Sequence, residues 1–278
     1  LKKNQELEGK TKVNLRNMSL YDDGAWAFAS FMQKNSLILE LDISFNSISD
    51  DGMQAIATIL PVMRQLATFK ANGNSFGFDG MRYLLGPLIA SRTIIRLELS
   101  GNSLCDDGAE LIGQKLLPMH PTLKELYLDE NMIGNDGIEQ LGHGLLRNKL
   151  LETLSVSKNL IYNYGAQRLA FAVQSSGSLK FLRVANCPLG PLGAKYFGDM
   201  LLLNDCLTYL DLSCIDLLRN KDASGMGCIV AGLTKTRTLK QLVLRNNGIT
   251  DMMATDIIQA LMVNYEIEHV DLVGNKIS

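Results

Sequence analysis

The side chains that could carry out chemistry are few and far apart in this sequence. The three histidines, His120, His143 and His269, lie in unrelated settings, so we expect surface positions and no shared metal site. The five cysteines form no CxxC pair and no tight cluster, and we expect them to be reduced core residues of a cytosolic protein. No phosphate-binding loop, nucleophile elbow or zinc-protease motif is present in the sequence. We therefore predict a protein that is not an enzyme and that needs no cofactor or metal.

One group of carboxylates is dense enough to be considered for acid–base chemistry. Glu125, Asp129 and Glu130 surround Tyr127 in a short stretch of the chain. We expect them on an open face, where nothing would raise the pKa of a carboxylate toward neutrality. We therefore interpret the group as an acidic patch around an aromatic side chain, suited to binding a basic peptide or helix.

The charge balance excludes several classes of partner. The chain of 278 residues carries 27 Lys and Arg against 29 Asp and Glu, a net charge of −2, whereas nucleic-acid binders present a strongly basic face. No apolar run reaches the roughly 20 residues that cross a bilayer. We expect neither a nucleic-acid partner nor membrane insertion. Because the sequence begins with Leu1 and not with Met, we also expect a piece of a longer protein.

A repeat of about 28 residues runs through the chain. Each copy reads apolar, two free positions, apolar, one free, apolar, two free, Asn, one free, apolar, as in residues 38–48. The Asn position of the ten copies falls at Met18, Asn46, Asn74, Asn102, Asn131, Asn159, Cys187, Ile215, Asn247 and Asn275. Successive copies are 28 residues apart except for one spacing of 29 and one of 32. Such regularity indicates a solenoid of stacked units.

This pattern resembles the leucine-rich repeat of the ribonuclease-inhibitor-like class, over residues 10–278. The resemblance implies an α/β fold, a right-handed horseshoe solenoid with a parallel sheet on the concave face and helices on the convex face. We expect residues 1–278 to form a single domain of about ten repeats. The residue pattern itself predicts the same elements. Apolar and polar residues alternate at 41–43, which predicts a short strand, and the apolar spacing at 53–60 predicts an amphipathic helix.

Several positions within the repeat carry more detailed expectations. The repeated Asn should bond neighbouring backbone and form a ladder in which Cys187 is a tolerated substitute, whereas the copies with Met18 and Ile215 should be locally looser. The Asp of each Asp-Gly pair, such as Asp51, should cap the start of its own helix. A small residue such as Gly113 should let the helix pack closely on the strand.

The free positions of the strands must point into the concave face. Phe181 and Tyr209 are neighbours in one column, with Arg183 and Asp211 beside them. An exposed aromatic pair flanked by Arg is the composition of a protein-binding hot spot. We predict a partner-binding surface there, and we include Arg245 of the following copy in it.

Opposite charges also fall side by side on adjacent strands. The simplest interpretation is cross-strand pairing that neutralises the sheet. The predicted neighbours are Asp42–Lys70–Glu98, Arg96–Glu125 and Arg183–Asp211.

The two irregular spacings interrupt the array at different places. The spacing of 32 places four extra residues between Leu217 and Gly225, with Arg219 and Lys221 on a loop beside the concave rim. We assign both side chains to the binding surface, with a neutral surface insertion as the alternative. The spacing of 29 adds its residue near Pro118, behind the helix, where we expect no effect.

The resemblance implies a non-catalytic scaffold that holds a protein partner in its concave face, within a larger assembly. Proteins with such repeats include ciliary and axonemal proteins, actin-regulating scaffolds and NOD-like receptors. By that analogy we expect a cytoplasmic location and an axonemal or other cytoskeletal complex. One alternative is a GTPase-activating protein resembling the Ran-specific activators, although their acidic tail is absent here. The other is the sensor domain of a NOD-like receptor, which needs a nucleotide-binding domain upstream of Leu1.

Overall fold

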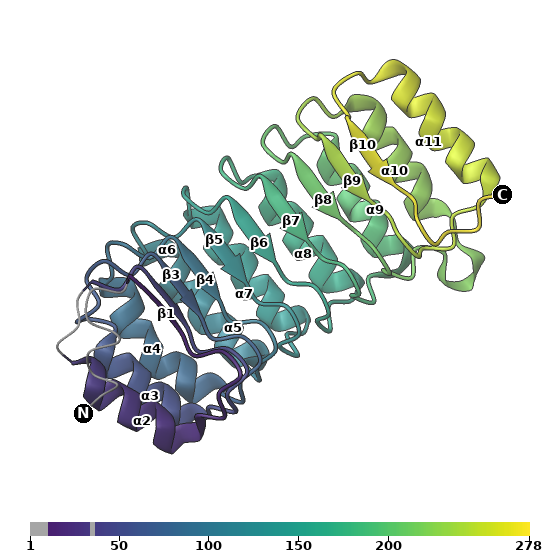
Figure 1. Cartoon of the computed structure of the whole chain (residues 1–278). Helices are drawn as coiled ribbons and strands as arrows, with labels where there is room; N and C mark the ends of the chain where they lie inside the picture. Colours follow the sequence, from purple (N-terminus) through teal and green to yellow (C-terminus); the bar gives the residue numbers. More distant parts are fainter. Residues whose placement is uncertain (1–10, 34–36) are drawn as a thin grey trace.

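The computed structural model describes residues 11–33 and 37–278, which form one curved array of strand–helix units (Figure 1). The strands pair in parallel and in sequence order within one sheet. They are β1 (Lys12–Asn14), β2 (Glu40–Asp42), β3 (Thr68–Lys70), β4 (Arg96–Glu98), β5 (Glu125–Tyr127), β6 (Thr153–Ser155), β7 (Phe181–Arg183), β8 (Tyr209–Asp211), β9 (Gln241–Val243) and β10 (His269–Asp271). The predicted repeat solenoid is confirmed.

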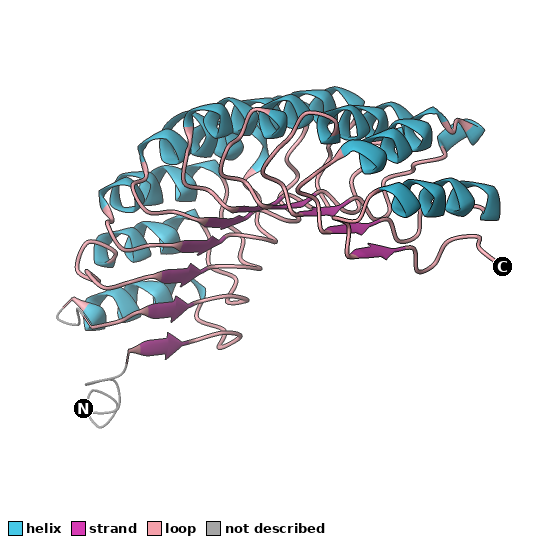
Figure 2. Cartoon of the chain, turned by 90° about the horizontal axis from the view of Figure 1, so that it is seen from above, coloured by secondary structure: helices cyan, strands magenta, loops and turns pink. Residues whose placement is uncertain are grey.

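The helices lie on the outside of the arc and the sheet on its inside (Figure 2). They are α2 (Tyr21–Met32), α3 (Asp50–Ile59), α4 (Phe78–Ala90), α5 (Cys105–Leu111), α6 (Leu117–Met119), α7 (Asn135–Arg147), α8 (Asn163–Gln174), α9 (Gly190–Leu201), α10 (Ser224–Lys235) and α11 (Asp251–Val263). A π-helical turn, η1 (Ile112–Leu116), follows α5, and a 3₁₀ turn, η2 (Arg219–Lys221), precedes α10. Helices are wider than strands, so stacking the pairs curves the sheet inward.

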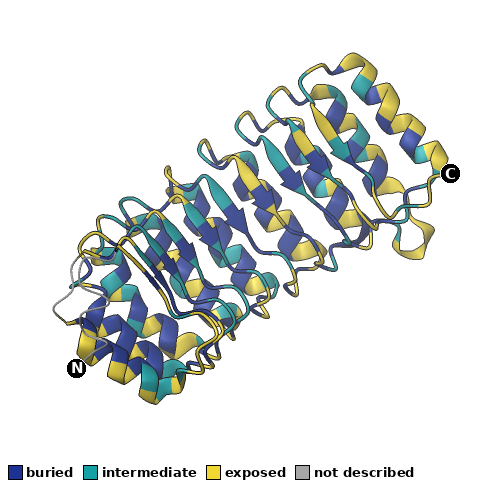
Figure 3. Ribbon diagram, in the orientation of Figure 1, coloured by how far each residue is buried: buried dark blue, intermediate teal, exposed yellow. Residues whose placement is uncertain are grey.

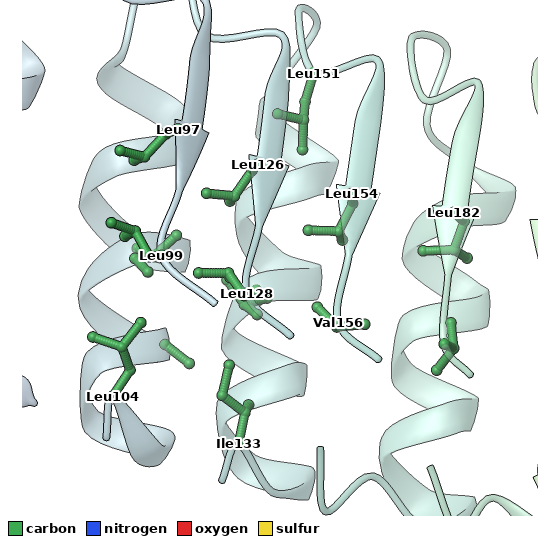
Figure 4. Packing of buried hydrophobic residues seen from close by; sticks show 14 of the residues in the cluster. Leu97, Leu99, Leu104, Leu126, Leu128, Ile133, Leu151, Leu154, Val156 and Leu182 are labelled. Carbon is green, nitrogen blue, oxygen red and sulfur yellow. The ribbon is translucent and has the colours of Figure 1, made fainter. Parts of the chain in front are cut away.

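The middle residue of each strand points into a core between sheet and helices. Leu97, Leu126, Leu154 and Leu182 stack in a row from four adjacent strands and have no exposed surface (Figure 4). The flanking residues of each strand face the concave side, as the period of two requires. The sheet register places the predicted neighbours opposite one another, for example Phe181 opposite Tyr209. The columns inferred from the repeat are therefore confirmed.

Buried asparagines bond each repeat to the next, as predicted. The Asn159 Nδ2 donates to the carbonyl oxygens of Leu128 at 2.9 Å and Val156 at 2.8 Å. Its Oδ1 accepts from the backbone N–H groups of Asn131 and Ile133, both at 3.0 Å. One side chain thus satisfies backbone groups of two repeats, which would otherwise be buried without partners.

The substituted rungs of this ladder keep part of its bonding. The Cys187 Sγ donates weakly to the carbonyl oxygen of Val156 at 3.5 Å, which agrees with its predicted role. Ile215 is fully buried, and its N–H still donates to Oδ1 of Asn247 at 3.0 Å. Met18 likewise donates its N–H to Asn46 Oδ1 at 2.8 Å. Both copies therefore lose only the bonds that their own side chain would make, and their local looseness stays a prediction.

The helix starts are capped across repeats, which corrects the expected role of the Asp-Gly aspartates. Asp22, not Asp51, accepts the N–H groups of Ser49 at 2.8 Å and of Gly52 at 3.1 Å through its Oδ1. Asp22 belongs to the preceding helix, α2. The carboxylate therefore satisfies free N–H groups of the next helix and links two units. Gly52 leaves room for the Asp22 carboxylate, because a Cβ at this position would clash with that carboxylate and would lie 2.5 Å from an Ile48 methyl group.

The extra residue of the 29-residue spacing lies close to Pro118, as predicted, but inside the helix and not behind it. It is accommodated by a π-helical turn, η1, through which the helix continues from α5 into α6. In the next rung of the ladder, the Oδ1 of Asn131 is buried and has no partner among the described residues. Gly113 within η1 packs against the backbone of Gln140 in α7. The small residue thus serves close approach of two helices, not of helix and strand as predicted.

His120 is buried, which corrects its predicted surface position. It is 3% exposed, and its Nδ1 accepts the N–H groups of Thr122 at 3.3 Å and Leu123 at 3.1 Å. Asn148 has the same role one repeat later, where its Oδ1 accepts the N–H of Leu151 at 2.6 Å. Burial, with the nearby positive charge of Arg92, lowers the pKa of His120 from 6.5 to about 4. The folded protein therefore holds this imidazole neutral at pH 7.

We expect acid to destabilise the fold through His120. Between pH 6.5 and 4 the unfolded chain binds a proton that the folded chain does not. Stability is therefore fully present above pH 6.5 and falls by about 2–3 kcal/mol as the pH drops toward 4. A His120→Asn variant keeps an acceptor but cannot titrate, so its unfolding free energy should fall less. Urea unfolding of both proteins at pH 7 and pH 4.5 measures the difference, and equal losses in the two proteins would refute this role.

Candidate functional site

The concave sheet has a central hollow between β5 and β9, which is the candidate site. Its volume is about 340 Å³. The lining residues come from five consecutive strands and are Glu125, Tyr127, Thr153, Phe181, Arg183, Tyr209 and Gln241. We call this set the central hollow. The sequence predicted Phe181, Tyr209, Arg183, Tyr127 and Glu125 as binding residues, and the fold brings these five together.

Two aromatic rings form one wall of the central hollow. The ring centroids of Phe181 and Tyr209 are 5.9 Å apart and the ring planes are inclined by 33°. Strand β7 is exposed at both ends and buried in the middle, and 45% of Phe181 is open to solvent (Figure 3). The aromatic pair is therefore pre-positioned by the sheet while its faces remain available for contact.

Arg183 lies over the Tyr209 ring, with its guanidinium carbon 5.5 Å from the ring centroid. Arg183 and Asp211 are register neighbours, as predicted, but the structure records no ion pair between them. The Asp211 Oδ1 instead accepts the backbone N–H of Ser213 at 3.0 Å and its hydroxyl at 2.7 Å. Asp211 thus organises the turn after β8, and its predicted pairing with Arg183 is corrected.

Tyr127 and Glu125 form the opposite wall and are held by Arg96. The guanidinium carbon of Arg96 lies 4.5 Å from the Tyr127 ring centroid, and its Nη1 is 2.5 Å from Glu125 Oε2. The Tyr127 hydroxyl donates to the same oxygen at 3.0 Å. Burial raises the pKa of Tyr127, so the phenol stays protonated and remains a donor at pH 7. The charges of Arg96 and Glu125 thus neutralise each other, and both side chains are in contact with Tyr127.

The carboxylates of the acidic patch predicted around Tyr127 are bonded to other residues of the chain. Asp129 accepts the Ser155 hydroxyl at 2.5 Å and the Ser157 N–H at 2.6 Å. Burial raises the pKa of Asp129, contrary to the expectation that nothing in this group would do so. Glu130 is exposed and pairs with Lys158 at 3.2 Å. Little free negative charge is left there to attract a basic peptide.

Other charges of the sheet are also paired, in some cases with a partner that differs from the predicted one. Lys70 binds Glu40 at 2.7 Å in place of Asp42, because Asp42 is 8% exposed and accepts the N–H of Ser44 in its turn. Arg245 binds Asp271 on the next strand at 2.5 Å. The predicted Arg96–Glu125 pair is confirmed.

The inserted loop forms the 3₁₀ turn η2 in the connection between β8 and α10. Arg219 and Lys221 are both exposed there. Arg219 pairs with Asp216 of the same loop at 2.6 Å, so part of its charge is used locally. Neither residue lines the central hollow, and their predicted role in binding stays a prediction.

The sequence analysis missed a second exposed aromatic, at the turns that follow β2 and β3. Phe45 has a positive φ of 60° and is 46% exposed. The Arg16 guanidinium lies 4.2 Å from its ring centroid. Gly73, with φ +61°, makes room for the ring, because a Cβ there would lie 2.5 Å from it. Gly in place of a side chain one copy after Phe45 is the sequence signal that could have revealed this contact.

Two features of the described residues bear on other classes of function. In residues 11–33 and 37–278, no three His, Cys, Asp or Glu side chains come together as a metal-binding group. In the same ranges no helix has the length and apolar character needed to cross a membrane. All five cysteines are free thiols, but only Cys187 is buried, so the expected core position is wrong for the other four. Burial raises the pKa of Cys187 to about 12, so this thiol is unreactive.

The known proteins that this chain resembles contain leucine-rich repeats. The leucine rich repeat family model matches residues 34–57 and 120–142. The chain is 29% identical over 184 residues to the ribonuclease inhibitor of Sus scrofa, a match that covers 56% of this chain and 40% of that protein. It is 30% identical over 142 residues to NACHT, LRR and PYD domains-containing protein 14 of Mus musculus, covering 50% of this chain and 14% of that protein. The chain thus spans less than half the length of each of these relatives.

A solved structure extends the likeness along nearly the whole chain. The leucine-rich repeat-containing protein LegL7 from Legionella pneumophila aligns with a TM-score of 0.60 over 96% of this chain and 85% of that one. The sequence identity is 15%, so this likeness concerns the fold.

Proposed function

We propose that this chain, a leucine-rich-repeat protein of the ribonuclease-inhibitor-like class, is a non-catalytic scaffold that binds a protein partner in its central hollow. The observation that carries the proposal is the Phe181–Tyr209 pair, of which Phe181 is exposed and Tyr209 half-buried, with Arg183 beside it. Aromatic and Arg side chains dominate the binding energy of protein interfaces. A partner that covers Phe181 removes apolar surface from water, at about 25 cal/mol for each Å² buried.

The shape of the sheet supports a protein ligand in preference to a small molecule. The central hollow is lined by side chains of the strands from β5 to β9, and these strands lie on the inside of the arc (Figure 2). A second hollow, which Arg16, Phe45 and Tyr127 help to line, lies next to it along the sheet. Adjacent hollows on a rigid curved surface suit an extended or globular partner, which can bury several of them together.

The setting of this scaffold rests on the resemblance alone. A cytoplasmic location, an axonemal or other cytoskeletal complex, and membership of a larger assembly are predictions of that kind. No particular feature of the described residues favours the GTPase-activating alternative.

A second candidate function is supported by the relatives. Three of them are named NACHT, LRR and PYD domains-containing proteins, which favours a role as the repeat domain of a receptor of that kind. The full-length transcript tests this directly, because the proposal requires a nucleotide-binding domain encoded upstream of Leu1. A transcript without such a domain would remove this candidate and leave the scaffold proposal intact.

We expect a Phe181→Ala, Tyr209→Ala double variant to lose partner binding without losing the fold. Both side chains are on the surface, so their removal leaves the core unchanged, whereas the hot spot disappears. The measurement is a pull-down from native lysate, read by quantitative mass spectrometry, with circular dichroism melting as the check on folding.

The matched control removes two aromatics from the convex face. Tyr164→Ala with Phe171→Ala deletes exposed rings of α8, which are 40% and 58% exposed. We expect this control to retain the partners of the unmodified chain. If both double variants retain the same partners, the central hollow is not the binding surface.

A further inference from the structure

The Lys and Arg side chains of the strands differ in whether a carboxylate of the sheet neutralises them. Within the described residues the ten strands carry four Lys or Arg side chains, and three are neutralised by carboxylates of the same sheet. Lys12 and Lys70 lie 3.0 and 2.7 Å from Glu40. Arg96 lies 2.7 Å from Glu98 and 2.5 Å from Glu125. The fourth, Arg183, has no ion pair in the described part of the chain, and it is the cation that lines the central hollow.

The carboxylates nearest to Arg183 are already engaged elsewhere. Asp211, opposite it on β8, accepts two hydrogen bonds from Ser213. Asp129 accepts bonds from Ser155 and Ser157, and only its longer-range field reaches Arg183. These two aspartates are therefore engaged by serines, and within the described residues the Arg183 guanidinium is left without an ion pair.

Space is available beside this guanidinium. On the β6 side its neighbours are Thr153 and Ser155, whose short side chains leave the hollow open between the two aromatic walls. Ser155 is 1% exposed, and its hydroxyl is bonded to Asp129. The face of Phe181 is exposed on the same strand as Arg183. A carboxylate on the β6 side would thus meet Arg183 while its neighbouring apolar group meets Phe181.

We infer that the central hollow recognises a protein segment in which an acidic side chain lies next to an apolar or aromatic one. Arg183 pairs with the carboxylate, and Phe181 and Tyr209 receive the apolar group. The planar guanidinium suits two-point binding of a carboxylate, and its carbon lies 5.5 Å from the Tyr209 ring centroid, beside the aromatic pair. This inference rests on the proposed function, since it specifies the partner of the same surface. It reverses the basic ligand expected from the acidic residues around Tyr127.

The test uses a random-peptide phage library selected on the whole chain. We expect the selected peptides to be enriched in Asp or Glu beside an apolar or aromatic residue. A selected peptide is then synthesised with a fluorescent label, together with its Asp→Asn or Glu→Gln analogue. Fluorescence polarisation measures both peptides on the unmodified chain, Arg183→Gln, Arg183→Lys, and the Phe181→Ala, Tyr209→Ala variant.

The four proteins separate the possible outcomes. We expect Arg183→Gln to weaken the acidic peptide by about tenfold or more, with partial recovery in Arg183→Lys. The neutral analogue should bind the unmodified chain and Arg183→Gln equally, which marks a direct pair in the double-mutant cycle. Peptides that need the aromatics but show no acidic preference would overturn this inference and spare the scaffold proposal. Failure to select any peptide, or peptides that bind unchanged to the aromatic variant, would overturn both.

Discussion

Replacing Asn159 by Ala is expected to lower the free energy of unfolding by about 4 kcal/mol or more. The side chain is 2% exposed and satisfies the carbonyl groups of Leu128 and Val156 and the N–H groups of Asn131 and Ile133. Alanine leaves all four groups buried without these bonds, and each such loss costs about 1–3 kcal/mol before relaxation. Chemical denaturation measures the total loss. Because repeat arrays can open locally, hydrogen exchange at the amides of 131 and 133 should show whether the stability is lost in these repeats.

The same position one repeat later provides the control. Cys187→Ala removes only the weak S–H contacts at 3.5 Å to Val156 and 3.7 Å to Ala185. We expect that variant to lose about 1 kcal/mol, chiefly from lost packing. Equal losses at Asn159 and Cys187 would contradict the account of the ladder, because the position would then matter only for its volume.

Gly198→Ala is expected to cost about 2–3 kcal/mol even though alanine is the better helix former. Gly198 lies in α9 where that helix touches the backbone of α10. A Cβ there would lie 2.6 Å from both the Cys228 carbonyl oxygen and the Ile229 nitrogen. Gly232 faces it from α10, and a Cβ at that position would lie 2.7 Å from the Gly198 oxygen. Two backbones cannot yield as a side chain would, so the helices must separate.

Gly227→Ala in the same pair of helices is the matched control. No atom lies within 4 Å of a Cβ built there. Without a clash, the substitution should stabilise α10 by about 0.5–1 kcal/mol. Thermal and urea unfolding of the two variants should therefore shift in opposite directions. A stabilised Gly198→Ala variant would show that α9 and α10 can separate at little cost.

The backbone of this protein was predictable from the sequence because the repeat leaves few alternatives. Nine spacings of nearly constant length place every strand, and the period of two then determines which side chains face inward. The register that pairs Phe181 with Tyr209 follows from counting residues. For the same reason the sequence alone predicted that Tyr127, Phe181, Arg183 and Tyr209 lie on the concave face, where they line the central hollow.

The details that were wrong depend on choices among nearby partners, which spacing does not determine. Asp211 and Lys70 each had an opposite charge across the strand, yet Asp211 bonds its own turn and Lys70 binds Glu40. A carboxylate can accept a backbone N–H two residues ahead at less entropic cost than it can hold a long flexible side chain. His120 was misplaced because it stands in a loop between Pro118 and Pro121, whereas its ring takes the role that a buried Asn has one repeat later.

Site-specific photocrosslinking tests the central claim most directly. A photoreactive phenylalanine analogue is placed at Thr153, in the central hollow, or at Gln114, on the convex side, and each protein is irradiated in native lysate. The account predicts partner adducts from position 153 that disappear when Phe181 and Tyr209 are replaced by Ala, and none of these adducts from position 114. Adducts to the same partner from position 114 alone would contradict it and would assign binding to the convex face.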